Sequence, residues 1–168
     1  DNLFAESLVA LNANTGERTW HFQMVHHGVW DYDLPTQPIL FPLAVDGRTI
    51  DAVAQLTKQG LTFVFDRTTG EPIWPIEERE VPQSDVPGER TSSTQPFPTR
   101  PPALIPTTGM NLDDAFDLTP ELQAAARRAM QQFRLGPLYT PPSIEGSLVR
   151  PGGGGAVNWG GGAFDTAT

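Results

Sequence analysis

The sequence contains no cysteine among its 168 residues, which excludes disulfide bonds and thiolate metal sites within this stretch. It also lacks any apolar run approaching the roughly 20 residues that a membrane-spanning helix needs. Positive charge is scarce, because 11 Lys and Arg stand against 20 Asp and Glu, for a net charge of −9. Binding to phosphates requires clustered Lys and Arg, so the composition argues against a nucleic-acid partner.

Turn-forming residues, by contrast, are abundant. The 17 prolines and 16 glycines favour short strands joined by many turns. The chain opens on Asp1 without an initiator methionine and stops at Thr168 inside what reads as a strand and turn, so we expect a piece of a longer protein. Any signal peptide or membrane anchor would then lie in segments ahead of Asp1, and membrane association would depend on those segments.

One turn motif occurs twice. Residues 10–20 (ALNANTGERTW) are echoed by residues 64–74 (VFDRTTGEPIW), which places Trp20 and Trp74 54 residues apart. This offset matches one four-stranded propeller blade with its loops. Gly16 supplies the positive φ that the first turn needs. We interpret both tryptophans as packing residues, with the indole against a neighbouring blade and its N–H bonded to a backbone carbonyl.

The hydrophobic pattern predicts short strands over most of the first 76 residues. The expected strands are 7–11, 19–25, 38–45, 50–56, 61–66 and 72–76. Asp46 and Gly47 form a hairpin signal between two of them.

A predicted insertion between blades covers residues 77–137. Its first part, 77–118, is polar, rich in proline and without a clear period, which predicts a long loop rather than a blade. Thr119 and Pro120 are typical of a helix start, and we expect one inserted helix near residues 120–134. The strand pattern resumes from Leu138. The whole of 1–168 is therefore interpreted as part of one domain of about two to three blades.

Residues 26–33 (HHGVWDYD) are too polar for a plain strand and follow the first turn motif, at a point where a propeller places its chemistry. Adjacent strand histidines point to opposite faces, so His26 and His27 are interpreted as hydrogen-bonded scaffold rather than as ligands of one metal ion. The glycine run 152–155 is not a phosphate loop, because it lacks both the Gly-Lys-Ser/Thr ending and a following helix.

Together these motifs resemble the pyrroloquinoline quinone (PQQ) dehydrogenases, most closely their membrane-associated, glucose-dehydrogenase-like branch. The segments that carry the resemblance are the two turn repeats, HHGVWDYD with the following Gln37-Pro38, and residues 94–98, 139–143 and 155–165. The resemblance implies an all-β fold: an arc of an eight-bladed β-propeller with a long proline-rich loop and one inserted helix. It also implies PQQ and Ca²⁺ as cofactors, a sugar or alcohol substrate, a quinone or cytochrome electron acceptor, and a periplasmic location.

The resemblance also assigns site residues by position. Asp31 matches the family's general base, near the calcium ion, and Lys58 matches the cation beside the quinone oxygens. Asn158 matches a cofactor-contacting side chain, and Trp159 is assigned either to the cofactor pocket or to blade packing. Two departures bear on the substrate: Asn158 stands where the best-known glucose enzymes look acidic, and Gly28 replaces an acidic residue common in the motif.

The chemistry is consistent with these assignments. Oxidising an alcohol by hydride transfer requires removal of the hydroxyl proton, which suits an ionised carboxylate, and a nearby lysine stabilises the charge that arrives with the hydride. We expect Asp31 and Lys58 to approach one another at one end of the blades, facing the axis. The alternatives are that Asp31 caps a turn, that Lys58 is a solvated turn residue, and that Asp33 is a competing carboxylate or supports the site from outside. At the level of the whole chain, the alternative is a non-catalytic propeller scaffold. Calcium ligands are expected mostly upstream of Asp1.

Overall fold

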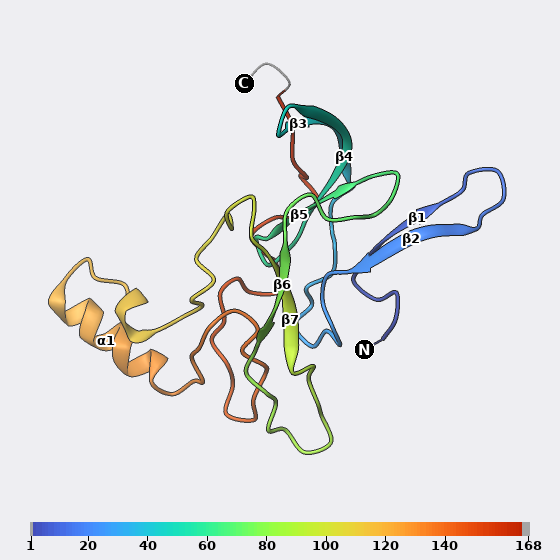
Figure 1. Cartoon of the computed structure of the whole chain (residues 1–168). Coiled ribbons are helices and arrows are strands. Elements are labelled where there is room, and N and C mark those ends of the chain that lie inside the picture. The colour runs from blue at the N-terminus through green and yellow to red at the C-terminus, as the bar shows by residue number, and fades with distance from the viewer. Residues whose placement is uncertain (1, 166–168) are drawn as a thin grey trace.

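The chain folds into antiparallel strand pairs, as the computed structural model of residues 2–165 shows (Figure 1). A two-stranded sheet comes first, followed by a three-stranded sheet and a second two-stranded sheet. Their strands are β1 (Ser7–Leu11) and β2 (Arg18–Gln23); β3 (Ile39–Val45), β4 (Arg48–Leu56) and β5 (Thr62–Asp66); and β6 (Ile76–Glu80) and β7 (Thr94–Pro98). One 3₁₀ helix, η1 (Leu112–Asp114), and one α-helix, α1 (Pro120–Met130), complete the elements. The β1–β2 hairpin and α1 project on opposite sides of the central strands.

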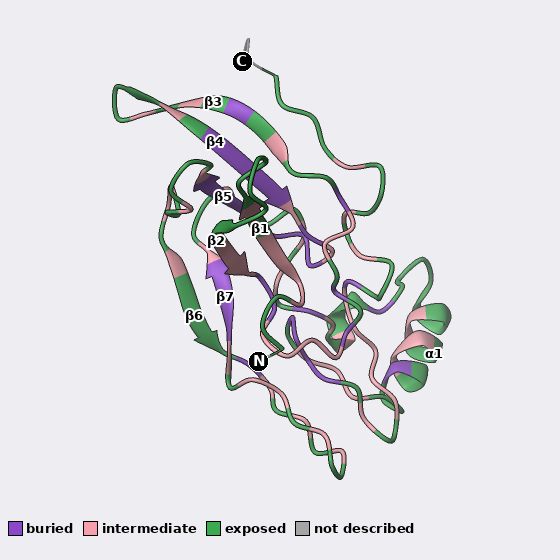
Figure 2. Ribbon diagram, turned by 90° about the vertical axis from the view of Figure 1, so that its right-hand side faces the viewer, coloured by how far each residue is buried: buried purple, intermediate pink, exposed green. Residues whose placement is uncertain are grey.

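The three-stranded sheet is the best-formed part of the chain. Asp46 and Gly47 both have positive φ, as a two-residue hairpin turn requires, and they set the register in which Val45 faces Arg48. Residues 52–55 of β4 are all buried, so this strand is covered on both faces (Figure 2). The strands predicted over 38–45, 50–56 and 61–66 are thus confirmed.

The predicted strand over 72–76 is wrong in extent. It is reduced to one β-bridge between Pro72 and Phe65, and the amide of Ile73 donates to the carbonyl oxygen of Val64 at 2.9 Å. Pro72 and Pro75 have no N–H group to continue the ladder, which explains why pairing stops.

The turn repeat acts as predicted, because the first tryptophan docks on the second copy of the motif. The indole Nε1 of Trp20 donates to the carbonyl oxygen of Arg67 at 3.0 Å. Its ring lies against Gly70, where an added Cβ would come within 2.7 Å of the indole. Trp74, half-buried, packs against the cluster formed by Phe41, Ala52, Ala54 and Val64. Both tryptophans are therefore packing residues.

The segment predicted as a long loop contains a sheet, and this part of the prediction is wrong. Strands β6 and β7 pair from Ile76 opposite Pro98 to Glu80 opposite Thr94. The sequence pattern missed β6 because four of its five residues are exposed and charged, so no alternation is visible. Strand β7 has three consecutive buried residues, including Gln95.

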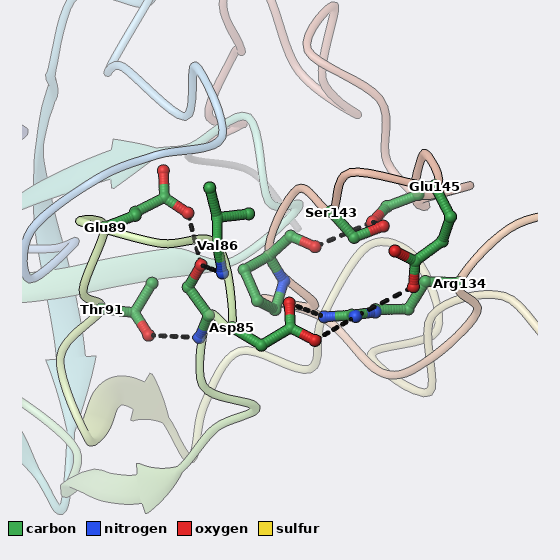
Figure 3. A network of polar contacts seen from close by, with 10 residues as sticks. Asp85, Val86, Glu89, Thr91, Arg134, Ser143 and Glu145 are labelled. Carbon is green, nitrogen blue, oxygen red and sulfur yellow. Dashed lines mark hydrogen bonds and ion pairs between the residues drawn. The ribbon is translucent and has the colours of Figure 1, made fainter.

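An ion-pair network ties the loop after β6 to the segment that follows α1 (Figure 3). The guanidinium of Arg134 donates to both carboxylate oxygens of Asp85, at 2.9 and 2.6 Å, and to Glu145 at 2.9 Å. The Arg134 backbone also bonds to Gly146 and Leu148. One side chain thus joins the loop after β6 to the segment after α1, 49 residues away along the chain.

The inserted helix begins where predicted. The hydroxyl of Thr119 accepts the amide of Leu122 at 3.3 Å, and Pro120 occupies the first turn. The helix ends at Met130, before the predicted end near residue 134, because the amides of Gln132 and Phe133 bond three residues back instead of four.

Beyond α1, the expected return to strands is not seen in the described residues. Only two isolated bridges occur there, Met110 with Gly136 and Arg134 with Ser147. Prolines and glycines are dense in this stretch, and they weaken or interrupt ladders. No helix in the described part of the chain has the length and apolar character needed to cross a bilayer.

A buried aromatic core joins the sheets to the polar motif. Its members come from β5, β7 and two loops, namely Phe63, Phe65, Phe97, Trp30, Tyr32 and Tyr139. The motif at residues 26–33 is therefore packed directly on the core, which fixes its backbone.

Candidate functional site

Residues 30–33 alternate between the core and the surface. Trp30 and Tyr32 are buried, whereas Asp31 and Asp33 are exposed. The indole N–H of Trp30 donates to the carbonyl oxygen of Thr140 at 2.9 Å. The hydroxyl of Tyr32 donates to the carbonyl oxygen of Pro151 at 2.8 Å. Because both aromatic residues are anchored, the two aspartates are displayed from a fixed backbone. Asp31 has a φ of 59°, in the left-handed region that Asp tolerates better than most residues.

Tyr139 packs against the buried side of the loop at residues 30–33. It is fully buried, its ring meets those of Trp30, Tyr32 and Phe97 edge-on, and its hydroxyl accepts the side-chain amide of Gln59 at 3.3 Å. Burial raises the pKa of Tyr32 to about 12, so that phenol remains protonated and able to donate.

Lys58 reaches the same loop from the turn between β4 and β5. This turn is closed by Thr57, whose hydroxyl and amide both bond to the carbonyl oxygen of Leu61. The ammonium Nζ of Lys58 donates to the main-chain carbonyl of Asp31 at 2.9 Å and forms an ion pair with the carboxylate of Asp33. Lys58 is the only lysine in the sequence, and its side chain is 12% exposed.

Asp31 and Lys58 lie side by side, as predicted, but Lys58 bonds to the Asp31 main chain, and the carboxylate that pairs with it is that of Asp33. That the two residues face the propeller axis stays a prediction. Sequence reasoning treated Asp33 as a competitor for the role of base or as a supporting residue. The alternation described above explains the difference. Both aspartates point outward, and the lysine bonds to the backbone of one and to the side chain of the other.

The glycine run at residues 152–155 packs against Lys58 and Asp31, a role that sequence reasoning did not assign to it. The amide of Ala156 donates to the carbonyl oxygen of Lys58 at 2.7 Å. Gly155 has a positive φ, and an added Cβ there would lie 2.5 Å from Cγ of Lys58. A Cβ added at Gly153 would lie 3.7 Å from the side chain of Asp31, which is an ordinary contact. Glycine is therefore required at position 155, and that requirement was the available signal.

Asn158 and Trp159 lie beyond this run, on the surface. The side chain of Asn158 donates to the carbonyl oxygen of Gly154 at 2.8 Å and accepts the amide of Trp159 at 2.8 Å, so it organises its own turn. Trp159 is 87% exposed. Their assignment to a cofactor pocket stays a prediction.

His26 is a scaffold residue, as predicted. Its amide donates to the buried side chain of Gln95 at 2.8 Å, and Gln95 returns a bond to the His26 carbonyl at 2.7 Å. Its ring lies 3.0 Å from the carboxylate of Glu78. His26 and His27 line a polar cavity of about 490 Å³ beside the loop between β6 and β7.

No group of three or more His, Cys, Asp or Glu side chains within residues 2–165 is arranged to hold a metal ion. The suggestion that Asp31 lies near calcium therefore has no supporting ligands among the described residues, and it stays a prediction.

The complete chain, residues 1–168, matches the family described as PQQ glucose/ethanol/alcohol dehydrogenase, beta-propeller domain. It is 39% identical over 162 residues to the quinoprotein glucose dehydrogenase of Escherichia coli (strain K12), covering 96% of this chain and 20% of that protein. The quinoprotein glucose dehydrogenase of Gluconobacter oxydans (strain 621H) is 42% identical over 163 residues, again covering 96% and 20%. The quinate/shikimate dehydrogenase (quinone) of Acinetobacter baylyi (strain ATCC 33305 / BD413 / ADP1) is 40% identical over 167 residues, covering 98% and 20%.

Solved structures agree on the fold. A quinohemoprotein alcohol dehydrogenase, ADHIIG of Pseudomonas putida HK5, matches with a TM-score of 0.52 and 29% identity over 95% of this chain and 18% of that one. A europium-containing methanol dehydrogenase matches with a TM-score of 0.57 and 19% identity over 97% and 22%. The predicted arc of a β-propeller is thereby confirmed. The chain spans about a fifth of the length of the curated relatives cited above.

Proposed function

The chain belongs to the PQQ family of glucose, ethanol and alcohol dehydrogenase β-propeller domains, and from this premise we propose that it forms one wall of the active site of a PQQ-dependent dehydrogenase. The observation that carries the proposal is the position of Lys58. A nearly buried ammonium is fixed beside the exposed side chain of Asp31, on a loop that two aromatic anchors hold rigid. A propeller scaffold without chemistry has no need of this arrangement.

The donor set fits a quinone cofactor. An ammonium has three N–H groups, and among the described residues two of them are used, by Asp31 and Asp33. The third remains available to a quinone oxygen. PQQ, when bound, supplies the acceptor for the hydride of the substrate alcohol. With PQQ bound, the Lys58 ammonium would stabilise negative charge on the quinone oxygens.

Asp31 is the proposed base. Its side chain is exposed, and it is not used by Lys58, which bonds to the Asp31 main chain instead. The carboxylate is thus free to take the hydroxyl proton of the substrate at Oδ1 or Oδ2 as the hydride leaves. Asp33 neutralises Lys58 and is committed to that ion pair.

The proposed substrate is a sugar, such as a glucose-like aldose, or another alcohol, with electrons passed on to a quinone or a cytochrome. Relatives named for glucose and for quinate or shikimate support a polyhydroxylated substrate. We place the enzyme in the periplasm. Because the described residues offer no metal cluster, no step is assigned to Ca²⁺, whose ligands we expect from the rest of the protein, with Asp31 nearby.

The experiment that tests the proposal uses the full-length protein that carries this chain. The purified protein is incubated with PQQ and Ca²⁺, and dye reduction is followed with glucose, glycerol, ethanol and quinate. We expect PQQ-dependent reduction with at least one of them. A protein that binds PQQ in none of these conditions and reduces no dye would favour the non-catalytic scaffold.

A further inference from the structure

A cavity of about 390 Å³ lies between the loop that carries Asp31 and the segment after α1. Its lining combines apolar side chains, hydroxyl groups and Asp31 itself, among them Val29, Val149, Thr140, Ser143 and Ser147. The volume falls within the range of about 300–1,000 Å³ that is usual for small-molecule sites. An alcohol whose reacting hydroxyl meets the Asp31 carboxylate therefore has space here for the rest of its carbon chain.

The wall formed by residues 143–147 is held in place by its own hydrogen bonds. The amide of Gly146 donates to the carbonyl oxygen of Ser143 at 3.0 Å, and the amide of Arg134 donates to the carbonyl oxygen of Gly146 at 2.9 Å. Glu145, in the same turn, pairs with the Arg134 guanidinium (Figure 3). This wall of the cavity is thus preformed, as is usual for sites that bind small molecules.

The hydroxyl protons of this region are used within the protein. Thr140 donates to the carbonyl oxygen of Pro137 at 2.7 Å, and Ser147 donates to that of Pro141 at 2.9 Å. The hydroxyl oxygens of Ser143 and Ser147 lie 3.2 Å apart. Because a hydroxyl has one proton and two lone pairs, Ser143 supplies the proton of this contact. Among the described residues, the Ser143 oxygen therefore keeps its lone pairs for a ligand.

This lining favours an uncharged ligand that donates hydrogen bonds. The described residues that line the cavity include no Lys, Arg or His, and Lys58 bonds to the Asp31 main chain without lining it. A carboxylate on the substrate would find no cation there, and the Asp31 carboxylate would repel it. The hydroxyl of a sugar or polyol, in contrast, can donate to an acceptor oxygen while its C–H groups contact Val29 and Val149.

We propose that this cavity receives the non-reacting part of the substrate, and that Ser143 is a specificity-determining residue. Its hydroxyl oxygen accepts a hydrogen bond from the substrate and so selects a sugar or polyol over a hydroxy acid. The inference rests on the proposed function, because Asp31 is the base in that proposal. It also goes beyond that function, since relatives named for glucose and for quinate or shikimate leave the choice open.

The test uses the full-length protein with PQQ and Ca²⁺. Val149→Phe fills the cavity, and we expect it to lower kcat/KM for glucose about tenfold. Ser143→Ala removes one acceptor and should lower it about three- to tenfold. Both variants should keep kcat/KM for ethanol, which is too short to contact this wall. Ser93→Ala, at an exposed position before β7, is the control. Equal losses for the two substrates, or no loss for glucose, would overturn the proposal.

A further variant tests the selection by charge. Ser143→Lys places a cation in the cavity, and we expect the ratio of kcat/KM for quinate to that for glucose to rise about tenfold. A ratio that stays the same or falls would show that this wall does not choose between sugars and hydroxy acids.

Binding without PQQ separates the two proposals if the protein oxidises none of the substrates. Saturation-transfer NMR then compares glucose binding by the PQQ-free wild type and by Val149→Phe. Binding that the substitution removes would count against the proposed function and support the cavity as a sugar site. Equal signals from the two proteins would overturn the cavity assignment as well. An active dehydrogenase whose glucose kinetics ignore both substitutions would count against the cavity alone.

Discussion

At the scale of single residues, the site is organised by one cation held between a carboxylate and a main-chain carbonyl. Lys58 is bound to the main chain of Asp31 and to the side chain of Asp33, which divides the roles of the two aspartates. Asp33 forms the ion pair with the lysine, whereas the carboxylate of Asp31 makes no bond to it. This difference is the reason why we propose Asp31, rather than Asp33, as the base.

Asp31→Asn should remove most turnover in the full-length protein while leaving PQQ binding largely intact. The amide has nearly the same shape but cannot accept the hydroxyl proton, and loss of a general base costs about 10²–10⁴-fold in rate. The measurement is dye-linked kcat together with cofactor retention after gel filtration. Near-normal turnover would transfer the base to another residue, with Asp33→Asn as the next variant to assay.

Gly155→Ala should lower both activity and thermal stability. Its Cβ would meet the Lys58 side chain at 2.5 Å, and its φ of 76° is strained for alanine. Lys58 would have to shift from its two oxygen partners. Gly154→Ala is the matched control, because a Cβ there has nothing within 4 Å. Equal melting temperatures and kcat values for the two variants would show that the close approach of Gly155 to Lys58 affects neither stability nor activity.

The sequence alone could predict that Asp31 and Lys58 lie together, because the family motif carries both at a fixed spacing, and the structure brings them together. It could not predict the ion pair of Lys58 with Asp33 or the close approach of Gly155 to Lys58. Those contacts join segments far apart in the chain, such as residue 155 and residue 58. A local sequence pattern cannot predict a contact between distant segments. The sign available in the sequence is a glycine that no local turn explains.

At the scale of elements, the sheets are joined by side chains rather than by shared strands. Trp20 links the β1–β2 hairpin to the turn after β5, and Arg134 links the β6–β7 loop to the segment after α1. The strands of the central sheet were predictable because their patterns are apolar and regular. Strand β6 was not, because its stability comes from pairing with β7 and not from its own burial.

Gly70→Ala should destabilise the protein more than Gly16→Ala. Both glycines have similar positive φ values, 79° and 74°, so both substitutions carry the same backbone strain. Only at Gly70 does the new Cβ also strike the Trp20 indole, which adds a cost of about 1–3 kcal/mol. Thermal unfolding of the two full-length variants measures the difference. Identical melting temperatures would mean that the docked indole contributes little.

Arg134→Met should lower stability at neutral pH and lose its effect in acid. Hydrogen bonds from Arg134 lower the pKa of Asp85, and the pKa of Glu145 is lowered by a bond to its own backbone amide and then by Arg134. Both groups therefore stabilise the fold above their usual pKa values of 3.8 and 4.5, and this contribution is lost as pH falls through the lowered values.

The measurement is the melting temperature of wild type and Arg134→Met at pH 7 and at about pH 3. We expect a clear difference at neutral pH and a small one in acid. Arg79→Met, which removes an exposed pair with Glu77 within β6, is the control and should change little at either pH. A difference of the same size at both pH values would mean that Arg134 acts by packing.

At the scale of the whole molecule, the chain is an open arc. Two of its three sheets have only two strands, and such pairs are marginally stable alone. Large apolar side chains stay exposed, including Leu40 at 62% and Leu11 at 59%. In a closed ring such faces and strand edges would be covered by neighbouring blades.

The 168-residue chain expressed alone should therefore neither retain PQQ nor oxidise glucose, and we expect it to aggregate or to pack loosely. Its Asp33 carboxylate is 62% exposed, and an ion pair with so exposed a partner contributes little. Gel filtration after incubation with PQQ and Ca²⁺, followed by a dye assay, gives the answer. Stoichiometric cofactor with turnover would show that these residues contain a complete site.

The docking of Trp20 on Gly70 bears on how such a ring can change its number of blades. In the two copies of the motif, the glycine of the second repeat, Gly70, receives the tryptophan of the first, Trp20. In a ring that repeated this contact, each repeat would carry one projecting tryptophan and one glycine that receives the tryptophan of the preceding repeat. Duplicating a whole repeat in the gene adds one tryptophan and one glycine, so every indole still has a glycine on which to dock. A deletion that removes half a repeat leaves one tryptophan or one glycine without its partner. The number of blades in such a ring can therefore change by whole repeats during evolution, because the existing contact between tryptophan and glycine serves each added repeat.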